Sequence, residues 1–171
     1  RDPMITSSFG VGEMIRDAIR RGIRNFVVFI GGSATNDGGC GMLKALGYRF
    51  YDEFNNLIPA GGGKLNRLHY IDESRAMEEL KECKFVVASD VKNPLCGEEG
   101  ASMVYSIQKG ADEKMAFDLD YSLKRLAKET YDKWGIDYSN KEGAGAAGGI
   151  GFAFMAFLGG KIISGVDAVL D

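Results

Sequence analysis

Phe26-Val-Val-Phe-Ile30 runs directly into Gly31-Gly-Ser-Ala-Thr-Asn-Asp-Gly-Gly39, and this junction decides the fold. The apolar residues are all β-branched or aromatic, a composition that predicts a buried strand. In open α/β sheets, ligands bind where such a strand ends in a glycine-rich loop. We therefore expect an α/β fold with a ligand site at the end of this strand.

The glycine-rich loop carries groups that suit an anion. Gly31, Gly32 and Gly38 leave backbone N–H groups unshielded by a Cβ, so an anionic oxygen could approach the main chain. Short polar side chains stand between these glycines, namely Ser33, Thr35, Asn36 and Asp37. Residues 40–46 are predicted as a short helix closed by Gly47, whose N-terminal amides would point back at the loop. The loop is therefore a candidate binding segment for phosphate or substrate.

The same residues also fit a second interpretation. Ser33, Asn36 and Asp37 belong to the common helix-capping and turn-forming types, so the loop could simply connect a strand to a helix. Two standard phosphate motifs are excluded. The loop lacks the Gly-Lys-Ser/Thr of a Walker A sequence, and Lys44 stands where a Gly-x-Gly-x-x-Gly pattern starting at Gly39 needs its last glycine. The chemistry of the loop alone leaves both interpretations open.

Helix and strand patterns alternate over the rest of the chain. Apolar residues at helical spacing predict a first helix before the junction, with an apolar face made of Val11, Met14, Ile15, Ala18 and Ile19. Further strands are expected at residues 48–54, 85–88 and 103–107, and further helices at 73–81, 112–134 and 148–158. This alternation predicts one multilayer α/β domain, residues 1–171, with a central, at least partly parallel sheet flanked by helices.

The composition excludes several classes of function. The chain has a net charge of −3, which gives no electrostatic basis for binding nucleic acid or an anionic membrane. Its longest apolar run, residues 150–158, is shorter than the roughly 20 residues that cross a bilayer. Three widely spaced cysteines disfavour a disulfide framework or a zinc site; they are Cys40, Cys83 and Cys96. We expect reduced thiols in a cytoplasmic protein.

A second strand end repeats the arrangement of the first. Asp90 follows the predicted strand at 85–88, and if the two strands are parallel neighbours, Asp37 and Asp90 lie at the same edge of the sheet. Two carboxylates there could hold Mg²⁺ against nucleotide phosphates, or one could accept the proton of a substrate hydroxyl. The alternative is that both residues cap turns. Either aspartate is therefore a candidate base or metal ligand.

Other candidate residues lie elsewhere along the chain. Lys109, which precedes a glycine, could supply the positive charge that phosphoryl transfer needs, although a lone lysine before a helix is more often solvated. Asn93 could hold a substrate hydroxyl or carboxylate, although Asn-Pro is also an ordinary turn. The single histidine, His69, is expected to be exposed or structural rather than catalytic.

A dinucleotide fingerprint, Gly-x-Gly-x-x-Gly, is satisfied literally by Gly143-Ala-Gly145-Ala-Ala-Gly148, and Asp167 lies about 20 residues onward. The polar residues before it do not predict the buried strand that the fingerprint requires. We interpret the segment instead as the start of a tightly packed helix. Its Gly145 and Gly148 either line an anion site or only permit close packing.

Several of these segments together resemble the bacterial glycerate kinase family, type I. The resemblance rests on ordered blocks at residues 31–39, 41–47, 61–72, 88–97, 100–102, 108–111 and 143–149. It covers the middle of the family only, because members of the family begin upstream with an acidic glycine-rich motif and continue downstream. The chain also opens with Arg1-Asp-Pro-Met4. We therefore expect it to be the central part of a larger two-domain enzyme.

The resemblance implies transfer of the γ-phosphoryl group of ATP to a hydroxyl of D-glycerate, with Mg²⁺ as cofactor. It implies catalytic roles for Asp37, Asp90 and Lys109, and packing against the rest of the enzyme's own chain, and it leaves homo-oligomer formation open. This chain alone is expected to be inactive. Two other classes stay open: a nicotinamide-dependent oxidoreductase, based on the fingerprint at Gly143, and a non-catalytic binding or association module.

Overall fold

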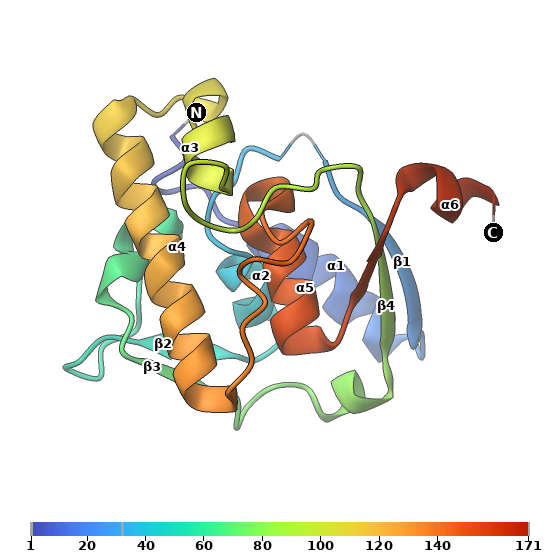
Figure 1. Ribbon diagram of the computed structural model, residues 1–171. Coiled ribbons are helices and arrows are strands. Elements are labelled where there is room, and N and C mark those ends of the chain that lie inside the picture. Colours follow the sequence, from blue (N-terminus) through green and yellow to red (C-terminus); the bar gives the residue numbers. More distant parts are fainter. Residues whose placement is uncertain (1, 32, 171) are drawn as a thin grey trace.

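The main sheet of the computed structural model has three parallel strands (Figure 1), and the structure describes residues 2–31 and 33–170. β1 (Asn25–Phe29) pairs with β4 (Lys84–Ala88), and β4 pairs with β5 (Lys161–Ile163). Phe26 stands opposite Phe85 in this register. The predicted α/β class with an at least partly parallel sheet is confirmed, and the strands at 26–30 and 85–88, whose pairing the sequence left open, are parallel neighbours.

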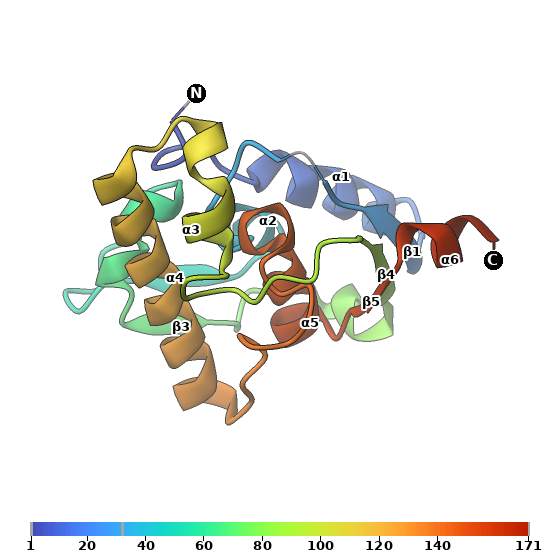
Figure 2. The ribbon, with the colours of Figure 1, turned by 45° about the horizontal axis from the view of Figure 1, so that its top comes forward.

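Helices and a second small sheet surround these strands. β2 (Arg49–Tyr51) and β3 (Tyr70–Asp72) form an antiparallel pair. The helices are α1 (Phe9–Arg20), α2 (Cys40–Ala45), α3 (Ala101–Tyr105), α4 (Glu113–Trp134), α5 (Ile150–Leu158) and α6 (Gly165–Leu170). Short 3₁₀ helices are η1 (Gly62–Arg67), η2 (Glu78–Glu82), η3 (Ile107–Lys109) and η4 (Ala146–Gly149). In both views, α4 lies on the opposite side of the molecule from β1 and β4, with α2 and α5 between them (Figure 2).

One face of the parallel sheet is covered and the other is open. The ring of Phe26 stacks on Phe85 at 4.9 Å, and Phe85 packs against Phe154 of α5 at 5.4 Å. Val27 and Phe29 point to the other face and are 60% and 64% exposed. β1 is therefore a strand, as predicted, but the prediction that it is buried is wrong, because Phe26 and Val28 are only half-buried and the other residues of β1 are exposed. The sequence is apolar on both sides of the strand, whereas the described part of the chain covers only one.

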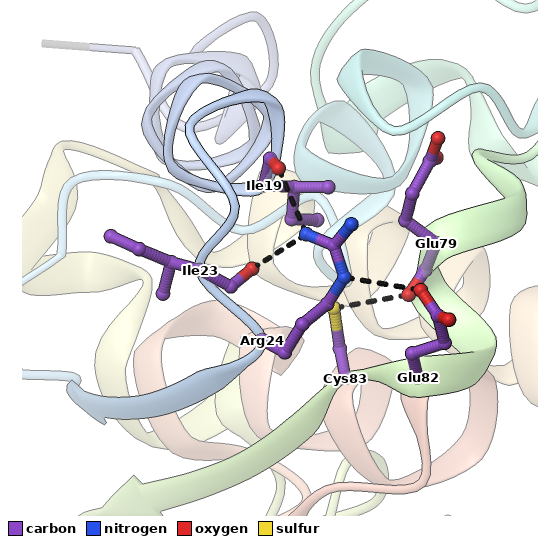
Figure 3. Close-up of polar contacts among 6 residues, drawn as sticks. All are labelled: Ile19, Ile23, Arg24, Glu79, Glu82 and Cys83. Carbon is purple, nitrogen blue, oxygen red and sulfur yellow. Dashed lines mark hydrogen bonds and ion pairs between the residues drawn. The ribbon is translucent and has the colours of Figure 1, made fainter.

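Arg24 joins the end of α1 to the start of the sheet (Figure 3). Its Nη1 donates to the carbonyl oxygens of Ile19 at 2.9 Å and Ile23 at 3.0 Å, near the C-terminus of α1, where carbonyl groups lack helical partners. Its Nε donates to Glu82 Oε2 at 3.2 Å, and its backbone carbonyl accepts a hydrogen bond from Lys84 N. Arg24 therefore fixes where β1 begins opposite β4.

α4 is the long helix that the sequence predicts at residues 112–134. Asp112 caps its first turn by accepting a hydrogen bond from Met115 N at 2.8 Å, and Gly135 ends it with a φ of 71°. The side chains of its inner face are fully buried; they include Leu119, Leu123 and Leu126. The predicted apolar stripe is confirmed at these positions, and it joins the core cluster that also contains residues of α1, α2, α5 and both sheets.

Three predicted elements differ from the structure. The strand predicted at residues 103–107 is wrong, because these residues belong to α3 and η3. The buried residues Ser102 and Ser106 are four positions apart, which is the spacing of a helix face and not the alternation of a strand. The helix predicted at 73–81 is replaced by η2, which begins only at Glu78. The strand predicted at 48–54 shortens to β2 and is followed by a turn at Asp52.

Cys40, Cys83 and Cys96 are free cysteines in the structure. No helix in the described part of the chain is both long enough and apolar enough to cross a bilayer.

Candidate functional site

A cavity of about 310 Å³ lies where the segments after β1 and β4 meet α3, η3 and η4. Its lining residues are Gly31, Ser33, Val91, Tyr105, Gln108, Lys109, Ala147 and Gly148. The structure thus brings together four of the predicted site residues, which lie far apart in the sequence: Gly31, Ser33, Lys109 and Gly148. Gly32, also predicted, lies outside the described residues. The position agrees with the rule that open α/β sheets bind ligands beyond the carboxyl ends of their strands.

Lys109 places a cation at this cavity. Its Nζ donates a hydrogen bond to the carbonyl oxygen of Thr35 at 2.7 Å, and the side chain is partly buried. Burial lowers the pKa of Lys109 to about 8, an effect that the nearby Asp37 carboxylate partly opposes. In the part of the chain that the structure describes, the ammonium group forms no ion pair with a carboxylate.

Hydrogen bonds hold the loop that faces Lys109. The hydroxyl groups of Ser33 and Thr35 are 2.6 Å apart, and Ser33 Oγ also accepts a hydrogen bond from Thr35 N at 3.0 Å. Thr6 Oγ1 donates to the carbonyl oxygen of Ala34 at 2.8 Å. The loop is therefore fixed from within and from the N-terminal segment.

The opposite wall of the cavity is a turn in an uncommon conformation. Ala147 (φ 52°, ψ 47°) and Gly148 (φ 65°) are both left-handed, and for Ala147 this conformation is strained. A Cβ on Gly148 would lie 2.0 Å from the carbonyl oxygen of Thr35, and Gly38 N donates to the carbonyl oxygen of Gly148 at 3.0 Å. Glycine is thus required for contact between the two loops. Turns that mix right- and left-handed residues can present successive N–H groups to an anion.

Asp37 does not line the cavity. Its carboxylate is 1% exposed and accepts four hydrogen bonds, from Ser8 N (2.8 Å), Ser8 Oγ (2.9 Å), Gly39 N (3.0 Å) and Gly41 N (3.1 Å). The next amide of α2, Met42 N, donates to Ser8 Oγ. The anion at the N-terminus of α2 is therefore Asp37 itself, which is the helix-capping alternative that the sequence left open. A catalytic role for Asp37 stays a prediction.

Asp90 and Asn93 both lie in the loop after β4. The Asp90 carboxylate is exposed and accepts a hydrogen bond from Gly165 N, at the start of α6, at 3.0 Å. Asn93 Oδ1 accepts a hydrogen bond from the hydroxyl of Tyr105 at 3.0 Å, and Asn93 Nδ2 donates to the carbonyl oxygen of Glu99. Asn93 therefore supports the cavity-lining Tyr105, and a direct contact with substrate stays a prediction.

Three other predicted binding residues are packed against their neighbours, and a role for them in binding stays a prediction. Asn36 is fully buried and donates from Nδ2 to Ser102 Oγ at 2.7 Å. A Cβ on Gly38 would lie 2.4 Å from Leu126 Cδ2, and one on Gly145 would lie 2.2 Å from the carbonyl oxygen of Pro94. These close approaches fix the loops around the cavity.

The sequence reasoning missed several residues of the site. Tyr105 was hidden inside a segment predicted as a strand, and Ala147 is an alanine without polar atoms in its side chain. Ser8 lies 29 positions before Asp37 in the sequence. A serine near the start of a helix gives no local signal of such a partner.

The described residues contain neither a cluster of metal-ligand side chains nor the strand that a dinucleotide fingerprint requires. Among residues 2–31 and 33–170, no cluster of three or more His, Cys, Asp or Glu side chains could by itself hold a metal ion. His69 is exposed, as expected, and does not line the cavity. Between the end of α4 and η4 there is no strand in the described chain, so the Gly143 fingerprint lacks the strand that it needs.

A comparison with models of protein families identifies the family of the chain. The model of the glycerate kinase family matches residues 1–171. The chain therefore belongs to the glycerate kinase family, and the resemblance found in its sequence blocks is confirmed.

Individual relatives agree with this assignment. The chain is 48% identical to the glycerate 2-kinase of Escherichia coli (strain K12) over 169 residues, covering 99% of this chain and 44% of the relative. It is 46% identical to a glycerate kinase of Bacillus cereus, covering 100% of this chain and 45% of the relative. A crystal structure assigned as glycerate kinase 2, from Salmonella typhimurium LT2, matches with a TM-score of 0.97 at 46% identity, covering 100% of this chain and 46% of that one. The chain thus spans less than half the length of these relatives.

Proposed function

We propose that the protein containing this chain phosphorylates D-glycerate, transferring the γ-phosphoryl group of ATP to a hydroxyl group and releasing phosphoglycerate and ADP. Membership of the glycerate kinase family supports this reaction. Both substrates are anions, whereas the chain itself has a net charge of −3. The positive charge at the site must therefore come from individually placed groups.

The observation that carries the proposal is the position of Lys109. Its ammonium group is partly withdrawn from water, lacks an ion-pair partner among the described residues and borders a cavity of about 310 Å³. An anion entering this cavity would stabilise the charged form of the lysine. The volume lies at the lower end of the range for ligand pockets, about 300–1,000 Å³, so it suits glycerate or a terminal phosphate better than a whole nucleotide.

The groups around Lys109 complete an anion-binding site. Ser33 contributes a hydroxyl, and the turn at Ala147 and Gly148 contributes backbone N–H groups. In phosphoryl transfer, catalysis consists mostly of positioning and charge neutralisation. We assign Lys109 to the neutralisation of a substrate carboxylate or of the transferring phosphoryl group.

We assign the role of proton acceptor or Mg²⁺ ligand to Asp90. Mg²⁺ is usually bound by one or two carboxylates together with phosphate oxygens and water, so a single exposed carboxylate at the end of β4 fits this ion. When bound, the ion would neutralise charge on the nucleotide phosphates. Asp37 fits less well, because it is only 1% exposed and accepts four hydrogen bonds from Ser8, Gly39 and Gly41.

Release of ADP tests the proposal. The complete protein is incubated with ATP and Mg²⁺, with and without D-glycerate, and L-lactate serves as a control acid that has a single hydroxyl group. We expect ADP release that depends on D-glycerate. Equal ADP release in the presence and absence of D-glycerate would overturn the proposal.

A further inference from the structure

The hydrogen bonds of Asp37 leave little room for chemistry with a substrate. Three of the four donors around Asp37, namely Ser8 N, Ser8 Oγ and Gly41 N, bind Oδ2, and Gly39 N binds Oδ1. Oδ2 has no acceptor position left, and with 1% of the residue exposed neither a substrate hydroxyl nor a cation reaches Oδ1 unless the surrounding loop moves.

The donors come from two different helices, so the carboxylate acts as a connection between them. Ser8 is the N-cap residue of α1, and Gly39 and Gly41 lie at the start of α2. Ser8 Oγ donates to Asp37 and accepts from Met42 N at 2.9 Å. A Cβ on Gly41 would lie 2.9 Å from Asp37 Oδ2, so the backbone of α2 packs closely against the Asp37 carboxylate.

The residues next to Asp37 in the chain hold both walls of the cavity. Two positions before it, the carbonyl oxygen of Thr35 accepts the hydrogen bond of Lys109 at 2.7 Å. One position after it, Gly38 N donates to the carbonyl oxygen of Gly148 at 3.0 Å. A change in the position of Asp37 would therefore move the lysine and the glycine turn together.

We propose that Asp37 is a positioning residue of the kinase site: together with Ser8 it fixes the loop that orients Lys109 and Gly148, and it takes no proton from the substrate. This inference rests on the proposed function and leaves Asp90 as the carboxylate available for chemistry.

The test uses four variants of the complete enzyme: Asp37→Asn, Ser8→Ala, the double variant, and Asp72→Asn as a control. The asparagine keeps one acceptor oxygen but turns an NH₂ group toward N–H donors. Asp72 is a half-buried aspartate at the end of β3 that accepts a hydrogen bond from Ser74 N and does not line the cavity. The control therefore removes a turn-capping charge without touching the network of Asp37.

We expect Asp37→Asn and Ser8→Ala each to lower kcat/KM by about 10- to 100-fold. Because both act through one contact, the double variant should lie within about threefold of Asp37→Asn. The pH profile of kcat/KM should keep its acidic limb in Asp37→Asn, and Asp72→Asn should match the wild type within about twofold.

A different set of results would identify Asp37 as the base and overturn the inference. In that case Asp37→Asn would lower kcat by more than about a thousandfold and abolish the acidic limb of the pH profile, while Ser8→Ala would have the activity of the wild type. Multiplicative losses in the double variant would overturn it as well.

Hydrogen–deuterium exchange supplies a readout that does not depend on activity. Faster exchange of the amides of residues 33–41 is expected in Asp37→Asn and Ser8→Ala and not in Asp72→Asn. Unchanged exchange in both site variants would contradict the positioning role. If Asp37→Asn does not fold, Ser8→Ala decides alone, because it keeps the carboxylate. If the wild type shows no glycerate-dependent ADP release, the proposed function fails while the exchange data still test the positioning role.

Discussion

Lys109 has a titration behaviour suited to anion binding near neutral pH. Burial lowers the pKa of its ammonium group to about 8, compared with an ordinary value of 10.5. Below pH 8 the group is mostly charged, and rising pH removes the charge that would attract a carboxylate or phosphate. A bound anion would favour the charged form and shift the titration upward.

We predict that Lys109→Met lowers kcat/KM for glycerate by about 10- to 100-fold, the range expected for the loss of a charge-assisted hydrogen bond worth about 1.5–3 kcal/mol. The measurement is glycerate-dependent ADP release by the complete enzyme. The wild-type kcat/KM should also fall as pH rises above about 8, and Lys109→Met should lack this decrease.

Lys114→Met is the matched control. Lys114 is a neighbouring lysine whose side chain is 84% exposed and pairs with Asp118 at the surface. Its replacement should leave the activity and the alkaline limb unchanged. Equal effects of the two substitutions would show that Lys109 acts only through the overall charge of the protein.

Residue types and spacing predicted only part of the site. Gly31, Ser33, Lys109 and Gly148 were found because polar or glycine residues stood at strand ends and in glycine-rich segments. Ser8 was not assigned to the loop, because its contact with Asp37 joins positions that only the packing of α1 against α2 brings together. The charge of Asp37 suggested catalysis, but the charge alone does not reveal how many donors surround it.

At the scale of elements, two loops in direct contact form the cavity. The turn of η4 approaches the loop after β1 so closely that Gly148 admits no side chain, since a Cβ would lie 2.0 Å from the carbonyl oxygen of Thr35. Gly159, at the end of α5, has the same φ of 65°, but a Cβ there would meet no atom of the described residues within 4 Å. Alanine substitutions at the two glycines therefore distinguish the energetic cost of a left-handed backbone, present at both, from the cost of a steric clash, present only at Gly148.

We predict that Gly159→Ala destabilises the protein by about 1 kcal/mol, the cost of a left-handed alanine, and leaves activity intact. Gly148→Ala should cost at least about 2 kcal/mol more, because its Cβ meets backbone atoms that are fixed on both sides. It should also raise KM for glycerate, since the displaced Thr35 carbonyl holds Lys109. Urea unfolding and steady-state kinetics of both variants measure these effects, and equal stabilities would show that the loops separate without strain.

Elements with a strong local signal were predicted well. β1, β4 and α4 have continuous apolar runs or a clear helical stripe. β5 was not predicted, because its three residues form a strand only through pairing with β4. The segment of α3 was predicted as a strand because its short apolar run is compatible with a strand or a helix. Ser102 and Ser106, which are both buried and four positions apart, lie on one face of a helix and not on one face of a strand.

At the scale of the whole molecule, the chain covers 44–46% of its relatives. One face of the parallel sheet is open, with Val27 and Phe29 exposed. The cavity around Lys109 supplies positive charge and one exposed carboxylate, Asp90, lies in the adjoining loop. Phosphoryl transfer also needs a nucleotide site and the exclusion of water.

We predict that residues 1–171 alone show no glycerate-dependent ADP release, whereas the complete protein does. The physical reason is that positioning two anionic substrates in line requires groups on both sides of the reacting phosphate. A coupled assay for ADP on both proteins, with circular dichroism to confirm that the shorter one is folded, makes the comparison. Turnover by residues 1–171 above about 1% of the complete enzyme would place all essential catalytic groups within this chain.

The sequence by itself determined the α/β class, the long fourth helix, the family and the glycine-rich loop that opens the site. These depend on local periodicity and on motifs that are contiguous along the chain. Only the tertiary structure decided which polar groups of that loop face the cavity and which form hydrogen bonds inside the protein. Lys109 contacts the carbonyl oxygen of Thr35, 74 positions before it in the sequence. The buried carboxylate of Asp37 accepts a hydrogen bond from Ser8, 29 positions before it. Such contacts form only when the helices pack, and for that reason the residue type alone did not reveal that Asp37 is buried while Asp90 is exposed.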